Sequence, residues 1–161
     1  MKTAVILQCA KDKSKTPKPA RDFYNGRNYN KILPMVESMG DLFIFSSHYG
    51  LISGDTVIEY YDSTFETVPP GYAKNYTKEY KTIFRNEGVK QQLKMIPVVE
   101  KQLHLLNQYD NVITIFSKAY MKVFNQAGGN KIEILDWQDK CGGIYNLPNH
   151  IQNKINERNT I

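Results

Sequence analysis

Residues 9–21 carry the side chains best suited to bind an anion. The stretch reads CAKDKSKTPKPAR, so one thiol stands among five cations: Cys9, Lys11, Lys13, Lys15, Lys18 and Arg21. Ammonium and guanidinium groups bind phosphate oxygens through charge-assisted hydrogen bonds. The composition therefore suits a loop that holds a phosphate or a nucleic-acid backbone, and it equally suits a solvated surface loop.

Two further segments bring hydroxyl groups, an imidazole and another cation. Ser46, His48, Tyr49 and Gly50 follow one apolar run of the chain, and Ser117 and Lys118 follow another. A histidine can act as a general acid or base near neutral pH, or it can bind a phosphate. Because His48 stands close before a glycine, a plain turn residue is the alternative.

Three acids, Asp55, Glu59 and Asp62, come shortly after this histidine. A carboxylate beside an anion-binding pocket repels the ligand, which implies a task such as activating water or binding a sugar hydroxyl. The alternative is a carboxylate that pairs with Arg21 and fixes the cationic loop. Both roles stay open at this point, and they can coexist.

Apolar periodicity predicts the elements that must position these groups. Nearly continuous apolar runs predict buried strands at residues 3–9, 41–46, 111–116 and 131–135, with a turn at residues 48–55. Helical spacing predicts helices at residues 20–39, 72–87, 89–107, 118–127 and 148–158, with a kink or break at Pro97. Residues 62–71 show no period and contain Pro-Pro-Gly, which predicts a linker or a flexible loop that a ligand could order.

Buried strands that alternate with helices predict a parallel sheet covered on both faces. We expect one α/β domain over residues 1–161, built as a three-layer sandwich around a mainly parallel sheet of four strands. Ligands of such sheets bind at the carboxyl ends of the strands. Since the three polar segments follow strand ends, we expect their side chains to surround one crevice.

The composition favours an anionic partner. Lysine and arginine number 21 against 16 acids, which gives a net charge of +5 and a pI of about 9.1. Nucleic acid is the commonest partner of a basic domain. Eleven tyrosines, several of them among polar residues, suit stacking on bases. A basic domain without such a partner is the alternative.

Other classes of protein find no support in the sequence. Cys9 and Cys141 are too few for a disulfide scaffold or a closed zinc site, and the three histidines lack ligand spacing, so we expect no metal and no cofactor. No Walker, dinucleotide-binding or GxSxG motif occurs. No apolar stretch suits a membrane span or a signal peptide, which predicts a cytoplasmic protein.

Four motifs together resemble a known family. They are the CAK of residues 9–11, the ARDFY of residues 20–24, the SSHYGL of residues 46–51 and the VIEYYD of residues 57–62. Their order and spacing resemble a family of bacterial and phage domains of unknown function. That family is similar to the YaaA proteins of the peroxide response and, more distantly, to the uracil-DNA-glycosylase-like middle domain of archaeosine synthase. Ala10 stands where serine is common, and Tyr60 stands where proline is usual.

The resemblance implies work on nucleic acid, DNA rather than RNA, in a uracil-DNA-glycosylase-like fold. By analogy we expect a DNA glycosylase that flips a modified or damaged base into the crevice and cleaves its glycosidic bond. A carboxylate would stabilise the oxocarbenium-like sugar or activate water. The candidates are Asp22, Glu59 and Asp55, in that order, because Asp22 opens a helix beside the cationic loop.

The remaining side chains would bind the substrate. Lys11, Lys13, Arg21 and Lys118 would hold the backbone, Tyr24 or Tyr49 would stack on the flipped base, and His48 or Tyr49 would bond to the departing base or to a phosphate. Cys9, a packing residue rather than a nucleophile, would complete the crevice with Ser46, Gly50 and Ser117.

Two other functions remain open at this stage. The first is a non-enzymatic DNA-binding protein of YaaA type, in which the same cations bind a duplex and no bond breaks. The second is an enzyme on free nucleotides, such as a nucleoside hydrolase or a base transferase.

Overall fold

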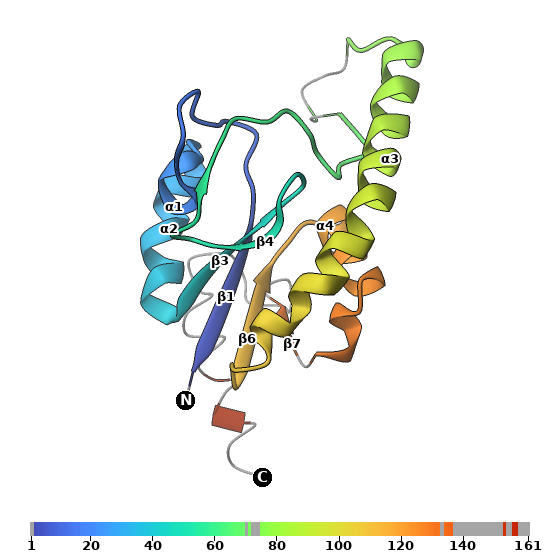
Figure 1. Ribbon diagram of the computed structural model, residues 1–161. Coiled ribbons are helices and arrows are strands. Elements are labelled where there is room, and N and C mark those ends of the chain that lie inside the picture. The colour runs from blue at the N-terminus through green and yellow to red at the C-terminus, as the bar shows by residue number, and fades with distance from the viewer. Residues whose placement is uncertain are drawn as a thin grey trace.

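A five-stranded sheet forms the centre of the protein (Figure 1). The computed structural model describes residues 2–69, 71, 75–132, 134–136, 153 and 156–157. The strands of the sheet are β1 (Thr3–Gln8), β3 (Asp41–Ser46), β4 (Gly50–Ser53), β6 (Asn111–Ile115) and β7 (Ile134–Asp136). Their order is β4-β3-β1-β6-β7, and only the β3–β4 pair is antiparallel. The prediction of a mixed α/β chain with a mainly parallel sheet is confirmed.

Burial explains why the apolar runs form parallel strands. Ala4, Val5 and Ile6 of β1 have no exposed surface, and every residue of β6 is buried. A strand in the middle of a parallel sheet is covered on both faces, so it reads as a continuous apolar run rather than an alternating one. The pairing aligns Leu7 with Ile44 of β3 and with Ile115 of β6.

Two strands differ from the prediction. β4 lies in the segment predicted as a turn, because its four residues are too few to show a period. It begins at Gly50, whose φ of 78° lets the chain reverse directly after β3. β7 begins at Ile134, later than predicted, because Gly129–Lys131 form the 3-10 turn η2.

The helices lie on the flanks of the strands. α1 (Ala20–Phe23) and α2 (Arg27–Met39) lie beside β1 and β3, whereas α3 (Lys78–Gln102) and α4 (Lys118–Gln126) pack against each other beside β6 (Figure 1). A second 3-10 turn, η1 (Leu103–Leu106), continues from α3. The predicted helix at residues 148–158 lies mostly outside the described residues.

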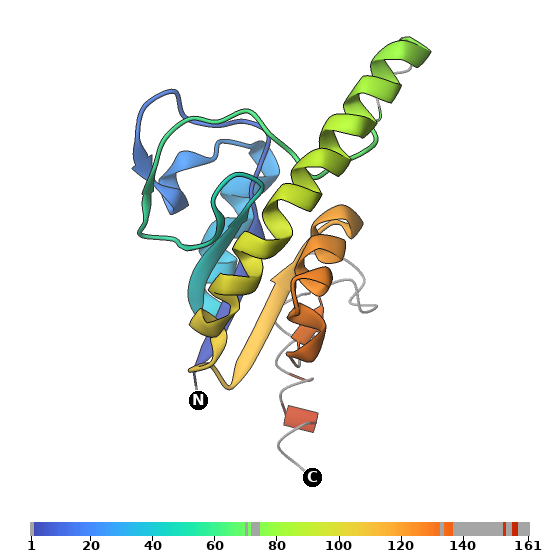
Figure 2. The same ribbon diagram turned by 45° about the vertical axis from the view of Figure 1, so that its right-hand side comes forward.

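α3 is one continuous helix of 25 residues where two helices were predicted. Neither Gly88 nor the exposed Pro97 interrupts it. A proline inside a helix removes one hydrogen bond, and tertiary packing on the buried Met95 and Val99 offsets that loss. The N-terminal half of α3 projects past the carboxyl ends of the strands (Figures 1 and 2).

The cationic segment after β1 is held by backbone hydrogen bonds. Its two-residue strand β2 (Lys18–Pro19) pairs with β5 (Val57–Ile58). A bridge joins Lys13 to Tyr24, and the Arg21 N–H donates to the Gly54 carbonyl over 2.9 Å. These bonds give the segment a fixed position, while its Lys11, Lys15 and Lys18 remain exposed to solvent.

Residues 62–69, predicted as part of a linker or flexible loop, pack into the core around Phe65. The Phe65 ring is fully buried, and its centroid lies 5.7 Å from that of Phe45 in β3 and 4.8 Å from that of Tyr120 in α4. The side-chain amide of the buried Gln92 donates to the Phe65 carbonyl over 2.6 Å. These contacts attach the segment to both α3 and α4.

Gly88 allows α3 to approach this segment closely. A Cβ atom at Gly88 would overlap the carbonyl oxygen of Glu66, which belongs to the backbone and cannot rotate away. The glycine is thus required for helix–loop contact rather than for a break in the helix.

We expect Gly88→Ala to lower the free energy of unfolding by about 1–2 kcal/mol, because overpacking against Glu66 exceeds the gain of about 1 kcal/mol in helix propensity. Urea denaturation followed by circular dichroism measures the change. The control is Asn86→Ala, an exposed position on the same helix where only propensity acts, which should be neutral or slightly stabilising. A stabilised Gly88→Ala protein would contradict this account.

Candidate functional site

An open cleft of about 1220 Å³ lies at the carboxyl ends of β1 and β6. Its floor is formed by residues 7–9, which end β1, and by residues 115–117, which end β6. The parallel pairing of these strands brings the two ends to one edge of the sheet. The location is the one expected for ligands of a parallel sheet.

Four of the predicted site residues line this cleft: Cys9, Lys11, Lys13 and Ser117. The Lys13–Tyr24 bridge holds both lysines at the rim. The Lys13 ammonium donates to the Lys11 carbonyl over 3.2 Å and lies 4.9 Å from the centroid of the Tyr61 ring. Lys11 is exposed, so its charge is available to an anion.

The thiol of Cys9 lies in a cluster of hydroxyl groups beneath the floor. Cys9 is buried, and its Sγ lies 3.3 Å from Tyr120 Oη and 4.0 Å from Ser47 Oγ. Nearby, the hydroxyls of Tyr24 and Tyr61 are 2.6 Å apart. Burial, with a smaller contribution from the adjacent Cys9, raises the pKa of Tyr24, Tyr61 and Tyr120 above the ordinary value. These phenols therefore remain neutral hydrogen-bonding groups at physiological pH.

Three carboxylates line the cleft: Asp62, Glu66 and Glu87. Glu66 is the best positioned of them, because Ser117 Oγ donates to its Oε1 over 2.6 Å. Ser117 is the N-cap residue of α4, so this carboxylate stands at the start of a helix, where the helix dipole favours negative charge. Its second oxygen remains available to a ligand or to water.

No local sequence pattern indicates Glu66, because the segment that carries it has no period. Its position depends on contacts made by residues far along the chain, such as Gln92 and Ser117. Asp62 was recognised among the acids after His48, but not as a cleft residue. Among the site residues predicted from the sequence, Ser117 is the one that contacts Glu66.

One wall of the cleft is a row of aromatic rings on α3 and just before it. Tyr76, Tyr80 and Phe84, which we call the aromatic row, are spaced four residues apart and all line the cleft. Their consecutive ring centroids are 4.4 and 6.2 Å apart. Tyrosine and phenylalanine rings in an open cleft can stack on planar ligands.

The opposite wall contains the start of α2. Gly26 is the N-cap residue of this helix and lines the cleft, and no side chain caps the helix there. Tyr29, in the first turn of α2, also lines the cleft and is 7% exposed. Its Oη is buried and has no hydrogen-bond partner in the described part of the chain.

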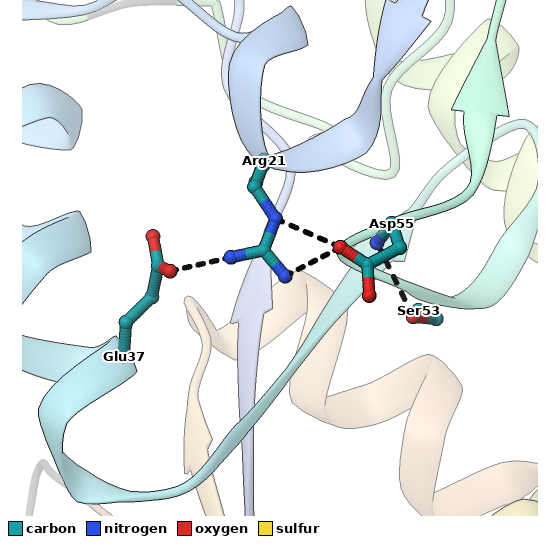
Figure 3. A network of polar contacts seen from close by, with 4 residues as sticks. All are labelled: Arg21, Glu37, Ser53 and Asp55. Carbon is teal, nitrogen blue, oxygen red and sulfur yellow. Dashed lines mark hydrogen bonds and ion pairs between the residues drawn. The ribbon is translucent and has the colours of Figure 1, made fainter.

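Arg21 and Asp55 lie away from the cleft, in an ion pair that closes the cationic segment (Figure 3). The Arg21 Nε and Nη2 atoms donate to Asp55 Oδ1 over 3.1 and 2.8 Å. Its Nη1 atom pairs with Glu37 of α2. The structural pairing that the sequence left open is therefore present, and Arg21 joins α1, α2 and the turn after β4.

Ser46 and Gly50 form the turn between β3 and β4 and are both buried. Ser46 Oγ accepts hydrogen bonds from the N–H groups of His48 and Tyr49 over 3.1 and 3.0 Å. A Cβ atom at Gly50 would overlap the side-chain amide of Gln102, which also donates to the Tyr49 carbonyl over 3.0 Å. These residues shape the turn and do not line the cleft.

His48, Tyr49 and Glu59 form a separate group at the edge of the site. The Tyr49 hydroxyl donates to the Glu59 carbonyl over 3.2 Å and accepts from the Glu59 N–H over 3.1 Å. The exposed His48 ring stacks on Tyr61, with centroids 5.1 Å apart. Tyr61 is thus covered by His48 and approached by Lys13, but none of the three residues of this group lines the cleft.

The other predicted residues also lie outside the cleft lining. Asp22 on α1 and Lys118 at the start of α4 are exposed. Tyr24 is 1% exposed and its ring packs on Phe23 and Tyr29, so it has no free face for a flipped base. The sequence thus located the correct edge of the sheet for a cleft but named a partly different set of residues.

The described residues contain no group of three or more His, Cys, Asp or Glu side chains that could hold a metal ion. No helix among them combines the length and apolarity needed to cross a membrane.

Residues 4–134 match the model of a protein family, DUF6884, whose description is a family of unknown function. The chain belongs to this family. The match spans every residue that lines the cleft, so the cleft lies wholly within the DUF6884 region. No curated protein and no solved structure matches the chain.

We expect Tyr29→Phe to raise the free energy of unfolding by about 1 kcal/mol, because it removes a buried hydroxyl that lacks a partner. The control is Tyr109→Phe, since the Tyr109 hydroxyl donates to Asp41 Oδ2 over 2.8 Å and its loss should be destabilising. Urea denaturation measures both changes. Equal destabilisation by the two variants would show that Tyr29 has a partner after all.

The buried phenols predict a loss of stability at alkaline pH. The pKa is raised for Tyr24, Tyr29, Tyr61 and Tyr120, and to about 12 for the partly exposed Tyr109, so five of the tyrosines in the described part of the chain are affected. A folded-state pKa above the unfolded value stabilises the fold below about pH 10, and this stability is lost as the pH rises further. Absorbance at about 295 nm should show these phenols ionising together with the loss of circular dichroism, whereas independent ionisation near pH 10 would contradict their burial.

Proposed function

We propose that this chain is an N-glycosidase that acts on a base of nucleic acid, most simply DNA, in the cleft at the carboxyl ends of β1 and β6. The observation that carries the proposal is the combination of groups around one cleft: two lysines, a row of aromatic rings and a positioned carboxylate. A nucleotide presents the complementary groups, which are a phosphate, a planar base and a sugar that becomes cationic during glycosidic cleavage.

The four sequence motifs support the same class of substrate. They resemble domains related to YaaA and to the middle domain of archaeosine synthase, and through the latter to uracil-DNA glycosylases. The proposal also includes a fold of three layers that resembles the uracil-DNA glycosylases. A parallel sheet with its cleft at the strand ends is consistent with it but is shared by many folds with unrelated activities.

Glu66 takes the role that was predicted for Asp22, Glu59 or Asp55. The hydrogen bond from Ser117 orients one of its oxygens, and in this proposal the other acts in the cleft as a base for water or as a partner for the sugar cation. None of the three predicted acids lines the cleft. In this arrangement Asp62 is a second acid within the same cleft.

Lys11 and Lys13 hold the backbone phosphate at the rim. Their ammonium groups neutralise phosphate charge, so binding should weaken steeply as salt rises. The pocket floor around Cys9 and Tyr120 supplies the buried surface against which a flipped base rests. In this arrangement the lysines at the rim bind the phosphate, and Glu66 takes part in cleavage of the glycosidic bond.

The decisive experiment incubates the protein with oligonucleotides that carry normal or modified bases. Released base is measured by chromatography, and abasic sites are measured by alkali cleavage. We expect Glu66→Gln to lower the rate by about 100-fold or more, because it removes a general base while it retains an oxygen that can accept from Ser117. Affinity for the oligonucleotide should stay within about threefold, because no binding group is lost.

Glu100→Gln, an exposed position in the C-terminal half of α3, is the matched control and should leave the rate unchanged. Asp22→Asn in parallel tests the carboxylate that the sequence ranked first. Tight binding without release of any base would overturn the glycosidase and favour a DNA-binding protein. Release from free nucleosides alone would favour a nucleoside hydrolase.

A further inference from the structure

The aromatic row is an exposed feature that supports the proposed function only as a surface for a planar group and takes no part in the bond cleavage at Glu66. Tyr80 is 42% exposed, and Tyr76 and Phe84 are partly exposed. Large aromatic side chains of a soluble domain are usually buried because each carries a large apolar area. Two of them on α3 and one just before it, with their rings in an open cleft, therefore indicate a planar partner.

Cations accompany the row on the same part of α3. Between residues 78 and 90 the helix carries four cations and two acids: Lys78, Lys81, Arg85, Lys90, Glu79 and Glu87. On a helix with about 3.6 residues per turn, Lys81 and Lys90 lie about a quarter turn to either side of the row. Both lysines are exposed. Glu79 and Glu87 lie on the same side of the row as Lys90, whereas Lys81 and Arg85 stand together on the other side. The row is thus an aromatic stripe with positive charge along one edge.

Single-stranded nucleic acid has the matching chemistry. Its unpaired bases expose π-faces that stack on aromatic side chains, and its phosphates bind the flanking cations. A duplex offers no such faces, because each base is already stacked between its neighbours and paired across the helix. The pairing of exposed rings with flanking cations therefore favours a single strand over a duplex.

The position of the row connects it to the cleft. The N-terminal half of α3 projects past the strand ends (Figure 2), and the three rings line the same cleft as Lys11, Glu66 and Tyr120. A strand stacked on the row can therefore continue into the cleft without leaving the protein surface.

We propose that the aromatic row binds single-stranded nucleic acid, with successive bases stacked on Tyr80 and Phe84 and the phosphates held by the exposed Lys81 and Arg85. The delivery of one base to Glu66 rests on the proposed function, whereas the binding of the strand does not. An unpaired substrate also removes the cost of extracting the base from a duplex.

Fluorescence anisotropy tests this inference with a labelled mixed-sequence DNA strand and with the same strand annealed to its complement. The measurements use a Glu66→Gln background, so that turnover does not consume the strand. We expect the single strand to bind more tightly than the duplex. Tyr80→Leu and Phe84→Leu should each weaken single-strand binding by about 5- to 100-fold, as removal of a stacking ring does.

Two matched variants separate the ring from its surroundings. Tyr80→Phe keeps the ring and should keep the affinity, and Tyr60→Leu removes an exposed tyrosine that does not line the cleft. Lys81→Gln should reduce the slope of log affinity against log salt by about 0.7, the value for one phosphate contact on a single strand. Equal unfolding midpoints for Tyr80→Leu and the parent protein establish that the variant is folded.

Each outcome bears on the inference. Equal affinity for duplex and single strand, or affinity that is unchanged in the leucine variants, overturns it. A shift of the Tyr80→Leu protein from dimer to monomer in sedimentation would also overturn it, because the row would then be a contact between copies of the chain. Ring-dependent strand binding without base release would refute the glycosidase alone, and base release from duplex only would refute the single-strand inference alone.

Discussion

The parallel pairing of β1 with β3 and β6 is the constraint on which the rest of the structure depends. Hydrogen bonds in register align residues 7 and 8 of β1 with the last residues of β3, and Leu7 with Ile115 of β6. Every segment that contributes to the cleft floor leaves the sheet at this common edge. A slip of one residue would reverse the side chains of a strand between the two faces, and it would also bury the polar groups that follow the strand.

The cleft is completed by two segments with little regular structure of their own, and each is held by contacts with distant parts of the chain. The cationic segment is attached through the β2–β5 pair and through Arg21, which binds both Asp55 and Glu37. The segment that carries Glu66 is attached through the buried Phe65 ring and through Gln92. If the two segments were flexible, the lysines and the carboxylate would move relative to one another. The attachments hold these side chains at fixed positions instead.

The sequence predicted what depends on local pattern and missed what depends on tertiary contact. The strands β1, β3 and β6 could be predicted because short, nearly continuous apolar runs are typical of strands that are buried on both faces of a sheet. α3 was divided in the prediction at Gly88 and Pro97, since the intrinsic preferences of these residues carry no information on the packing that overrides them. Glu66 could not be found for a similar reason: its role follows from Ser117, which is 51 residues further along the chain.

The pairing of Arg21 also has a consequence for selectivity. It is the only arginine in the cationic segment, and its guanidinium is occupied by carboxylates away from the cleft, so the cations that line the cleft among the described residues are lysines. A guanidinium recognises a phosphate in one planar, two-pronged geometry, whereas an ammonium is a mobile point charge. For the proposed nucleic-acid ligand, such a rim would tolerate many conformations of the backbone and discriminate poorly among them. Discrimination between ligands would then arise deeper in the cleft, from the shape and the hydrogen-bonding groups of its floor.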